Sequence, residues 1–444
     1  MLLDSLKILM PIFSEAWEIV RVWWWLPLPF ILWRPFSFLW HWWRTDKFLK
    51  KTKFILLEIK IPKEVLKPMR AMEIVMDGLW QILFDAPGDF FEKHIEGKRI
   101  LSYSFEIASI DGEPHFFVRT PKNNQDAVEA VIYSQYPDAE IFVADNYTKR
   151  VPQDIPNKDW DLWGADYKLM KPSPYPIKTY LKFETEREPL EEKRIDPLAS
   201  LLESMAKTKQ GEQYWVQITA KPVRGDVGGW EGVPWLKEGE KIRDELARRM
   251  EGKPVKKALI MEAADILITG DPPGGVKKER ELIPPEMKLT PGERDVVAEV
   301  EKKMAKRGFQ TNIRFIYLGK KDVFLKAKLR FALSFFSGFA TQNLNGLFPY
   351  GQPLLTKIKK GWFLPLNLLR NRRLYLRKRS IFRKYVLRFP PFFPRKSHWP
   401  SSFILNTEEL ATIFHFPGQR VAPAPFIKRI EAKKGEAPSG LPSE

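Results

Sequence analysis

The residue types that perform catalysis occur in this sequence, but their spacing matches no familiar site. The chain has no cysteine, which excludes disulfides, thiolate metal sites and thiol nucleophiles. The glycine-rich segments 270–275 and 343–353 lack the pattern of a P-loop, and neither a G-x-G-x-x-G nor a G-x-S-x-G motif is present. No two histidines have metal-ligand spacing; they are His41, His94, His115, His398 and His415. We therefore predict no catalytic site, no metal site, no cofactor and no enzymatic activity.

Tryptophan gives the clearest pattern near the start of the chain. Eight of the 16 tryptophans fall between Trp17 and Trp43. Tryptophan is amphipathic and is favoured where the hydrocarbon of a membrane meets water. The segment 1–50 is therefore predicted to be a hydrophobic membrane anchor, and the anchoring residues are Trp23, Trp24, Trp25, Trp33, Trp40, Trp42 and Trp43.

The depth of this anchor stays open between two alternatives. Residues 22–33 carry no charge but reach only about 18 Å as a helix, while residues 22–43 would reach about 33 Å and could cross a bilayer core of about 30 Å. Three prolines and Arg34 interrupt that longer stretch, so a kinked span and an interfacial anchor are both compatible with it. A tryptophan-rich core helix under another domain is the third interpretation.

Charge around the tryptophan segment predicts an orientation. Five basic residues follow it within ten positions: Arg44, Lys47, Lys50, Lys51 and Lys53. Cytoplasmic flanks of membrane segments carry an excess of lysine and arginine. We therefore expect a membrane-associated protein with the bulk of the chain on the cytoplasmic side.

A second charge pattern lies near the end of the chain. Residues 323–407 contain 17 lysines or arginines and no acidic residue, although the net charge of the whole chain is only +18. Within this basic tract, residues 370–389 have helical spacing with one apolar face, which is typical of helices that lie on anionic membranes and would equally suit a phosphate backbone. The predicted anion-binding residues are Arg372, Arg373, Arg377, Arg379, Arg383, Lys384 and Arg388.

Hydrophobic periodicity predicts an α+β fold with two ferredoxin-like βαββαβ units. The first unit spans 51–146, with strands at 54–61, 101–110, 115–120 and 139–144 and helices at 67–84 and 126–136. A proline-rich linker covers 147–176. The second unit spans 177–415, with strands at 177–186, 212–221, 310–318 and 402–405, a long insertion at 222–291 and the basic tract at 323–407. Residues 416–444 form a tail rich in proline and lysine.

Several strings resemble a known group of proteins. They are FILLEIKIPKEVLKPMRAME, IYSQYPDAEI, VPQDIPNKDWDLWGADYKL and FILNTEELATIFHFPGQRVAPAPFIKRIEAKKGEAP. Together they resemble the N-terminal region of large conjugation-type, type IV secretion-like ATPases of candidate-phyla bacteria, which is an uncharacterised domain. In similar proteins the stretch at 406–417 leads into a motor domain with a P-loop. This sequence has no such motif, so the resemblance implies a separately encoded motor or a truncated gene.

Two functions of different classes fit these observations. The favoured one is a non-catalytic, membrane-anchored scaffold that holds a type IV secretion-like or conjugation-like translocation ATPase at the cytoplasmic face of the membrane. Its partners would be membrane lipids and the separate P-loop motor, and DNA is a further candidate partner. An oligomer is also compatible with the sequence. The alternative is a nucleic-acid-binding protein that uses the basic tract 323–407.

Overall fold

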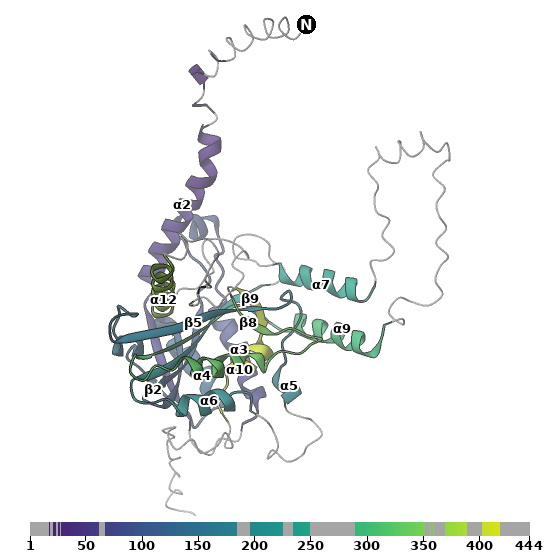
Figure 1. Cartoon of the computed structure of the whole chain (residues 1–444). Coiled ribbons are helices and arrows are strands. Elements are labelled where there is room, and N and C mark those ends of the chain that lie inside the picture. Colours follow the sequence, from purple (N-terminus) through teal and green to yellow (C-terminus); the bar gives the residue numbers. More distant parts are fainter. Residues whose placement is uncertain are drawn as a thin grey trace, which may run out of the picture. The chain divides into compact units, whose positions relative to one another are not determined.

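The computed structural model of the chain divides into two compact units (Figure 1). Unit 1 comprises Met1–Lys53, Asp85–Arg99 and Phe393–Arg395, and unit 2 comprises Phe54–Phe84, Ile100–Phe392 and Lys396–Glu444. The structure describes residues 17, 21–23, 25–26, 28–61, 67–183, 196–224, 234–248, 289–350, 356, 358, 369–388 and 402–417.

Helices and strands are interspersed along the chain. In unit 1 the described elements are α2 (Leu28–Lys51) and the short π-helix η1 (Glu92–Glu96). The strands of unit 2 are β1 (Phe54–Lys60), β2 (Tyr103–Ile110), β3 (Glu113–Pro121), β4 (Glu140–Val143), β5 (Trp160–Leu169), β6 (Glu212–Val223), β7 (Gly308–Lys320), β8 (Leu347–Pro349) and β9 (Phe403–Asn406). Its helices are α3 (Met69–Leu83), α4 (Gln125–Gln135), α5 (Tyr180–Phe183), α6 (Ala199–Ala206), α7 (Trp235–Leu246), α9 (Pro291–Met304), α10 (Leu329–Ser337), α12 (Arg370–Val386) and α13 (Thr407–Ile413), with short 3-10 turns η2 (Lys122–Asn124), η3 (Tyr147–Arg150) and η6 (Lys326–Lys328).

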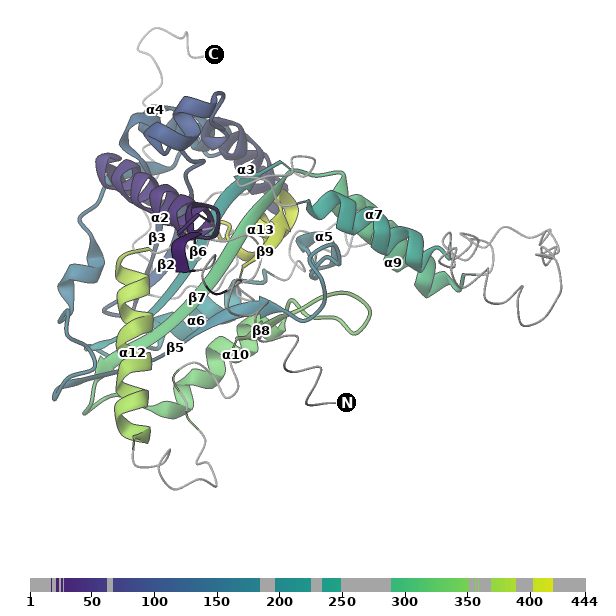
Figure 2. The ribbon, with the colours of Figure 1, turned by 90° about the horizontal axis from the view of Figure 1, so that it is seen from above.

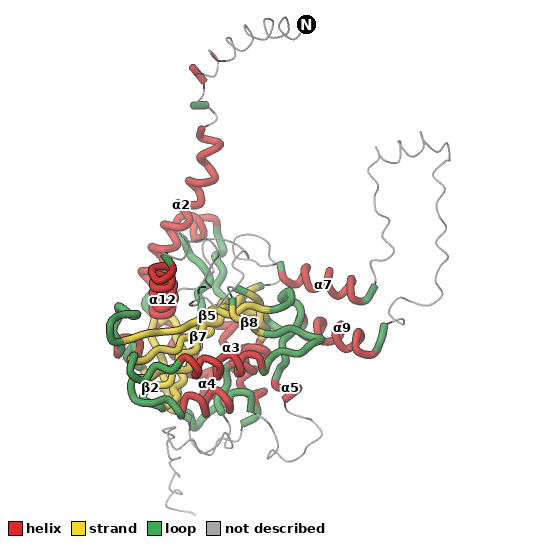
Figure 3. The backbone as a smooth tube through the Cα atoms, viewed as in Figure 1, coloured by secondary structure: helices red, strands yellow, loops and turns green. Residues whose placement is uncertain are grey.

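The strands of unit 2 form one antiparallel sheet of nine strands (Figure 3). Their order is β4-β1-β3-β2-β6-β7-β5-β8. Strand β7 is long enough to pair twice on the side away from β6, because residues 314–320 pair with β5 and residues 308–311 pair with β9. The long strands β6 and β7 pair along residues 212–223 and 308–319 and form the centre of the sheet.

Both faces of this sheet are covered. Successive strand residues point to opposite faces, and Val216, Ile218 and Phe315 therefore belong to one core cluster, whereas Trp215 and Ile316 belong to another. Helices α3, α4, α6, α10 and α13 supply side chains to the first cluster. Helix α12 supplies side chains to the second, and Figures 1 and 2 show it on the opposite side of the strands from α6 and α10.

The single sheet contradicts the prediction of two ferredoxin-like units. The first six elements of unit 2 occur in the predicted order, but β2 pairs with β6 along residues 103–108 and 215–220, so the strands of both predicted units belong to one sheet. The predicted linker 147–176 contains β5, a full strand in the interior of the sheet. The predicted strand at 177–186 instead contains helix α5, and its last three residues lie outside the described residues.

The prediction of a hydrophobic membrane segment is also wrong for the part of the chain that the structure describes. There, no helix is both long enough and apolar enough to cross a bilayer. Helix α2 has 24 residues, but Arg34 and the charged residues of its last turns interrupt its apolar sequence. Most of residues 1–27, including Trp24, and the tail after residue 417 lie outside the described residues.

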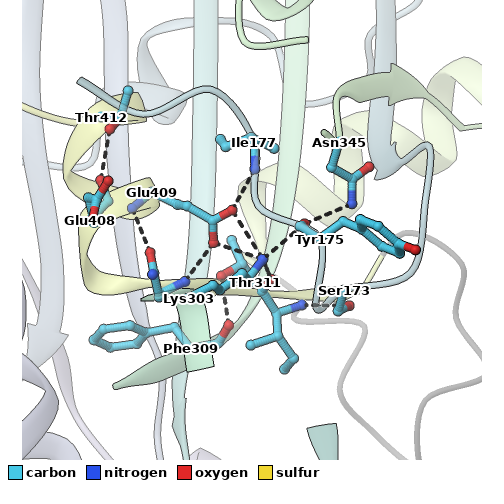
Figure 4. A network of polar contacts seen from close by, with 12 residues as sticks. Ser173, Tyr175, Ile177, Lys303, Phe309, Thr311, Asn345, Glu408, Glu409 and Thr412 are labelled. Carbon is cyan, nitrogen blue, oxygen red and sulfur yellow. Dashed lines mark hydrogen bonds and ion pairs between the residues drawn. The ribbon is translucent and has the colours of Figure 1, made fainter. Parts of the chain in front are cut away.

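A buried ion pair joins the C-terminal elements of unit 2 to the rest of the sheet (Figure 4). The Lys303 ammonium of α9 lies 2.9 Å from a carboxylate oxygen of Glu409, and both side chains are fully buried. Lys303 also donates to the carbonyl of Ile404, at 3.0 Å. The same carboxylate accepts from the backbone N–H of Ile177 at 2.8 Å and forms a capping box with Asn406 at the start of α13. Burial raises the pKa of Glu409 and lowers that of Lys303.

We expect Lys303→Met to lower the free energy of unfolding by about 3–5 kcal/mol, because the variant leaves the Glu409 carboxylate buried without its cation. Urea unfolding followed by circular dichroism measures this loss. The matched control is Lys302→Met, since the neighbouring Lys302 is largely exposed and pairs with Glu299 at the surface. That control should change stability by less than about 1 kcal/mol. Equal losses of stability in the two variants would contradict the conclusion that the buried Lys303–Glu409 pair holds the C-terminal elements to the sheet.

Candidate docking surfaces on helices α2 and α12

Helix α12 packs on the sheet through one side only. Its second half places Ile381, Phe382 and Tyr385 in the core cluster of the second sheet face, beside Trp215 of β6. Gly164 of β5 permits this close approach, because an added Cβ there would lie 2.9 Å from the Ile381 Cδ1 atom. The apolar face predicted from the sequence therefore exists, and it is buried against the sheet.

Arg388 closes the helix and inserts into the sheet. Its backbone has a positive φ of 49°, a conformation that non-glycine residues adopt only when the surroundings enforce it. The guanidinium binds the Glu106 carboxylate through two hydrogen bonds, Nε to Oε1 at 2.7 Å and Nη2 to Oε2 at 3.0 Å. It also donates to the side-chain oxygen of Asn146 at 3.1 Å. Planar bidentate pairing of this kind is geometrically specific, so it holds the end of α12 in one place.

Glu106 is the acceptor around which a buried polar network forms. Its carboxylate also accepts from the Ser104 hydroxyl at 2.6 Å, the Tyr147 hydroxyl at 2.7 Å and the Gln217 amide at 3.1 Å. Complete burial would raise the pKa of Glu106, but the charge and hydrogen bonds of Arg388 and the two hydroxyl donors outweigh burial and hold the pKa below its ordinary value. The group is therefore an anion fixed beneath α12.

The outward sides of α12 carry cations without acidic neighbours on the helix. Arg372, Arg373 and Arg383 are exposed, and Arg377 and Lys384 are half-buried. Arg379 is half-buried and donates to the backbone carbonyl of Asp154 at 3.0 Å. Arg388 differs from the other predicted anion-binding residues, because it is only 6% exposed and is engaged by Glu106. Six of the seven predicted residues thus remain on the accessible part of the helix.

Electrostatics at the start of α12 are unfavourable within the chain itself. The N-terminal end of a helix has a positive partial charge and favours anions. The first turn of α12 contains no acidic residue, and Arg370, Arg372 and Arg373 lie there instead. Lysine and arginine in the last turn, by contrast, match the helix dipole. An external anion at the first turn would relieve this concentration of positive charge.

Helix α2 of unit 1 exposes large aromatic side chains. The exposed fractions of Trp33, Trp42 and Trp43 are 65%, 47% and 46%, and that of Trp25, which precedes the helix, is 54%. Trp23 is also exposed, whereas Trp40 is half-buried and Trp24 lies outside the described residues. Exposed apolar neighbours extend the same helix: Phe30, Ile31, Leu32, Phe36 and Leu39. Apolar exposure on this scale indicates an interaction surface.

The remaining side of α2 contacts the π-helix η1. The Trp40 indole donates to the backbone carbonyl of His94 at 2.9 Å, and the ring nitrogens His94 Nδ1 and His41 Nε2 lie 3.1 Å apart. Gly97 follows η1 with a φ of +74°, and a Cβ at this position would lie 2.6 Å from the Arg44 carbonyl. Glycine is required here both by backbone conformation and by the close approach of α2.

Sequence reasoning missed the residues that position these surfaces. Glu106 lies in an alternating strand as one polar residue among several, and its partner Arg388 is 282 positions away. A glutamate that points to a buried sheet face is a signal, but it does not identify the partner. Among the described residues, no group of three or more potential metal ligands is present.

We expect Glu106→Gln to lower the free energy of unfolding by about 3–5 kcal/mol near pH 7, since Arg388 would keep a buried, uncompensated charge. The folded-state pKa of Glu106 is depressed, so its stabilising contribution is present above the ordinary value of 4.5 and is lost as pH falls through the folded pKa. The difference between wild type and variant should therefore narrow from about pH 4.5 downward. Urea unfolding at pH 7, 5.5, 4.5 and 3.5 measures it.

Glu203→Gln is the control for this series. Glu203 forms an exposed pair with Lys207 at 2.8 Å, so its replacement should cost less than about 1 kcal/mol. A wild-type-minus-variant difference for Glu106 that stays constant down to pH 3.5 would show that its carboxylate is not the fixed anion inferred from the geometry.

Comparison with known proteins identifies one family. The profile of a family described as a domain of unknown function, DUF8128, matches residues 66–358, which is more than half of the 444-residue chain. Helices α2 and α12 lie outside the matched residues. A search of curated proteins found no match to the chain. The central strands of the sheet and its covering helices α3 to α10 thus lie within the match, and the chain belongs to the DUF8128 family.

Proposed function

We propose that this protein is a non-catalytic scaffold that lies against an anionic membrane surface at the cytoplasmic face and holds a translocation ATPase there. The observation that carries the proposal is the set of outward cations on α12, a helix whose inner face is fixed by buried contacts. The contact is peripheral: α12 lies on the headgroups and α2 contributes aromatic side chains at the interface, without a span.

The free energies expected from each helix indicate that membrane binding needs both α12 and α2. A cation near an anionic surface contributes about 1 kcal/mol, so the accessible residues of α12 alone would give weak, reversible binding. Stable attachment to membranes generally takes two signals. Aromatic side chains of α2 provide the second, because full burial of a large apolar side chain contributes about 1.5–3 kcal/mol. Tryptophan is also the residue type that favours the interface over the hydrocarbon interior.

The ATPase partner is supported by the resemblance to conjugation-type ATPases. In those proteins the string that matches residues 406–417 leads into the motor. In this chain the string forms the end of β9 and helix α13, and every residue from Asn406 to Phe416 is buried. A separately encoded motor that docks beside this segment would contact the core of unit 2, which is the mechanical arrangement that a scaffold requires.

The cationic surface makes the first functional prediction. We expect the quadruple variant Arg372→Gln, Arg373→Gln, Arg377→Gln and Arg383→Gln to bind vesicles of phosphatidylcholine with 30% phosphatidylserine about 100- to 1,000-fold more weakly, because each cation contributes about 1 kcal/mol. Vesicle flotation at 150 mM salt measures the affinity. Wild-type binding should weaken as salt is raised, since these charges are screened.

An equally charged control separates position from net charge. The variant Lys207→Gln, Lys237→Gln, Lys241→Gln and Lys302→Gln removes four cations from other parts of unit 2 and should bind the vesicles within about threefold of wild type. Equal losses in the two quadruple variants would refute a specific role for α12. Preference for single- or double-stranded DNA over the vesicles in a direct competition would instead favour the nucleic-acid-binding alternative.

The aromatic surface makes the second functional prediction. Replacement of Trp33 and Trp42 by alanine should weaken vesicle binding by at least tenfold, through loss of apolar contact at the interface. Because this contribution is not electrostatic, the ratio of wild-type to variant affinity should persist at 500 mM salt, where the contribution of α12 is screened.

Tyr133 and Phe348 provide the control for this pair, because they are exposed aromatic residues of unit 2, at 37% and 43%. The variant Tyr133→Ala, Phe348→Ala should bind vesicles as wild type does. Unchanged binding by the Trp33 and Trp42 variant would remove α2 from the proposed contact and leave α12 as its whole basis.

A further inference from the structure

Two histidines meet where α2 packs on η1. His41 is 7% exposed, and its Nε2 lies 3.1 Å from His94 Nδ1, with the ring centroids 4.5 Å apart. Two imidazoles can share a hydrogen bond only when at least one of these nitrogens is an acceptor, which requires a neutral ring. The contact therefore exists in one protonation range and is lost when both rings carry a proton.

The surroundings of the pair favour neutral rings. Burial, followed by the charges of His94, Arg99 and Lys93, lowers the pKa of His41. Burial, followed by Lys93 and Arg99, lowers the pKa of His94. On the α2 side the nearest charged residue in sequence is Arg44, whose backbone contacts Gly97.

Acidic residues near the pair do not offset these cations. The Glu92 carboxylate of η1 is engaged by the Gly88 N–H at 3.0 Å and by Lys98 at 3.4 Å. Glu96 ends η1 and is exposed. Phe90 stacks on the His94 ring at 4.2 Å and adds an apolar side to the pair. A second proton would thus enter a region that is already cationic.

We propose that His41 and His94 form a pH-sensitive clasp that holds α2 against η1 at neutral pH and releases it on acidification. This inference rests on the proposed function, because α2 is the helix assigned to the membrane interface. Release frees the buried side of α2, with Trp40 and its indole N–H, for contact with lipid. The clasp thereby regulates how much of the apolar surface of α2 can contact lipid.

The direction of the pH dependence follows from the shifted groups. Both folded-state pKa values lie below 6.5, the ordinary value for histidine, so the neutral clasp is fully stabilising above about pH 6.5. Its stabilisation is lost as pH falls through the folded values. The sheet of unit 2 need not unfold, because the contact joins α2 and η1 within unit 1.

Hydrogen exchange of the full-length chain tests the clasp without reference to lipid. Protection factors of amides in residues 36–48 and 92–98, corrected for intrinsic exchange, should fall at least tenfold between pH 7.5 and pH 5.0. Amides of β6 and β7 serve as the internal control and should keep their protection. Loss of protection in β6 and β7 to the same extent, or no change in residues 36–48 and 92–98, would overturn the proposal.

Two variants and one control make the assignment specific. His94→Gln keeps a neutral hydrogen-bonding side chain and should remove most of the pH dependence, while His94→Lys carries a permanent charge and should expose the same amides at both pH values. His115→Gln is the matched control, because His115 pairs with Glu58 in unit 2 and should leave the profile of residues 36–48 and 92–98 unchanged. If the pH dependence of hydrogen exchange in His94→Gln were identical to that of wild type, the clasp proposal would be wrong.

Vesicle flotation at the two pH values separates this inference from the proposed function. Wild type should bind vesicles more tightly at pH 5.0 than at pH 7.5, and His94→Lys should bind at pH 7.5 as wild type does at pH 5.0. A pH-dependent exchange profile with no vesicle binding at either pH would keep the clasp and reject the membrane role. Vesicle binding without a change in exchange would reject the clasp alone.

Discussion

A fully buried ion pair between Lys303 and Glu409 is the constraint on which the arrangement of unit 2 depends. Burying two charges is expensive, so the pair persists only because its remaining donors and acceptors are also used: the Ile404 carbonyl, the Ile177 N–H and the capping box of α13. These contacts connect α9, β9, α13 and the segment before α5. The consequence is that a short C-terminal strand and helix become part of the core and do not form a peripheral tail.

A second buried pair, Arg388–Glu106, plays the corresponding role on the other face of the sheet. The two pairs differ in what they hold. Lys303–Glu409 closes the side of the sheet that carries most of the helices, whereas Arg388–Glu106 fixes one end of a single cationic helix. The basic residues of α12 and Arg388, just after its end, therefore have two different roles. The side chain of Arg388 is buried and stabilises the fold. The side chains of Arg372, Arg373 and Arg383 are exposed to solvent and are accessible to a partner.

Local signals in the sequence are sufficient for elements with strong periodicity and insufficient for their association. The hydrophobic pattern locates β1, β2 and β6, and helical spacing locates α3, α4 and α12, each within a few residues. Strand β5 escapes prediction because its acidic and aromatic residues and the surrounding prolines are typical of a loop. Its membership in the sheet depends on pairing with β7, about 150 positions later, which leaves no local pattern. The same limit explains why the sequence predicts two units where one sheet forms: a hydrophobic pattern defines a strand and its faces, but not its neighbour.

The candidate surfaces also depend on contacts between single side chains that are distant in sequence and that local patterns do not reveal. Aromatic and basic residues of α2 and α12 are visible in composition, since a solvent-facing residue needs no partner elsewhere in the chain. The groups that orient those helices, Glu106 beneath α12 and His94 beside α2, are defined by contacts across 282 and 53 positions. A docking helix presents its binding residues only when its other side is held, so the buried contacts determine which of many surface cations and tryptophans can act together. For this reason the buried contacts of α2 and α12, more than the number of exposed charges, determine which side chains each helix exposes at neutral pH.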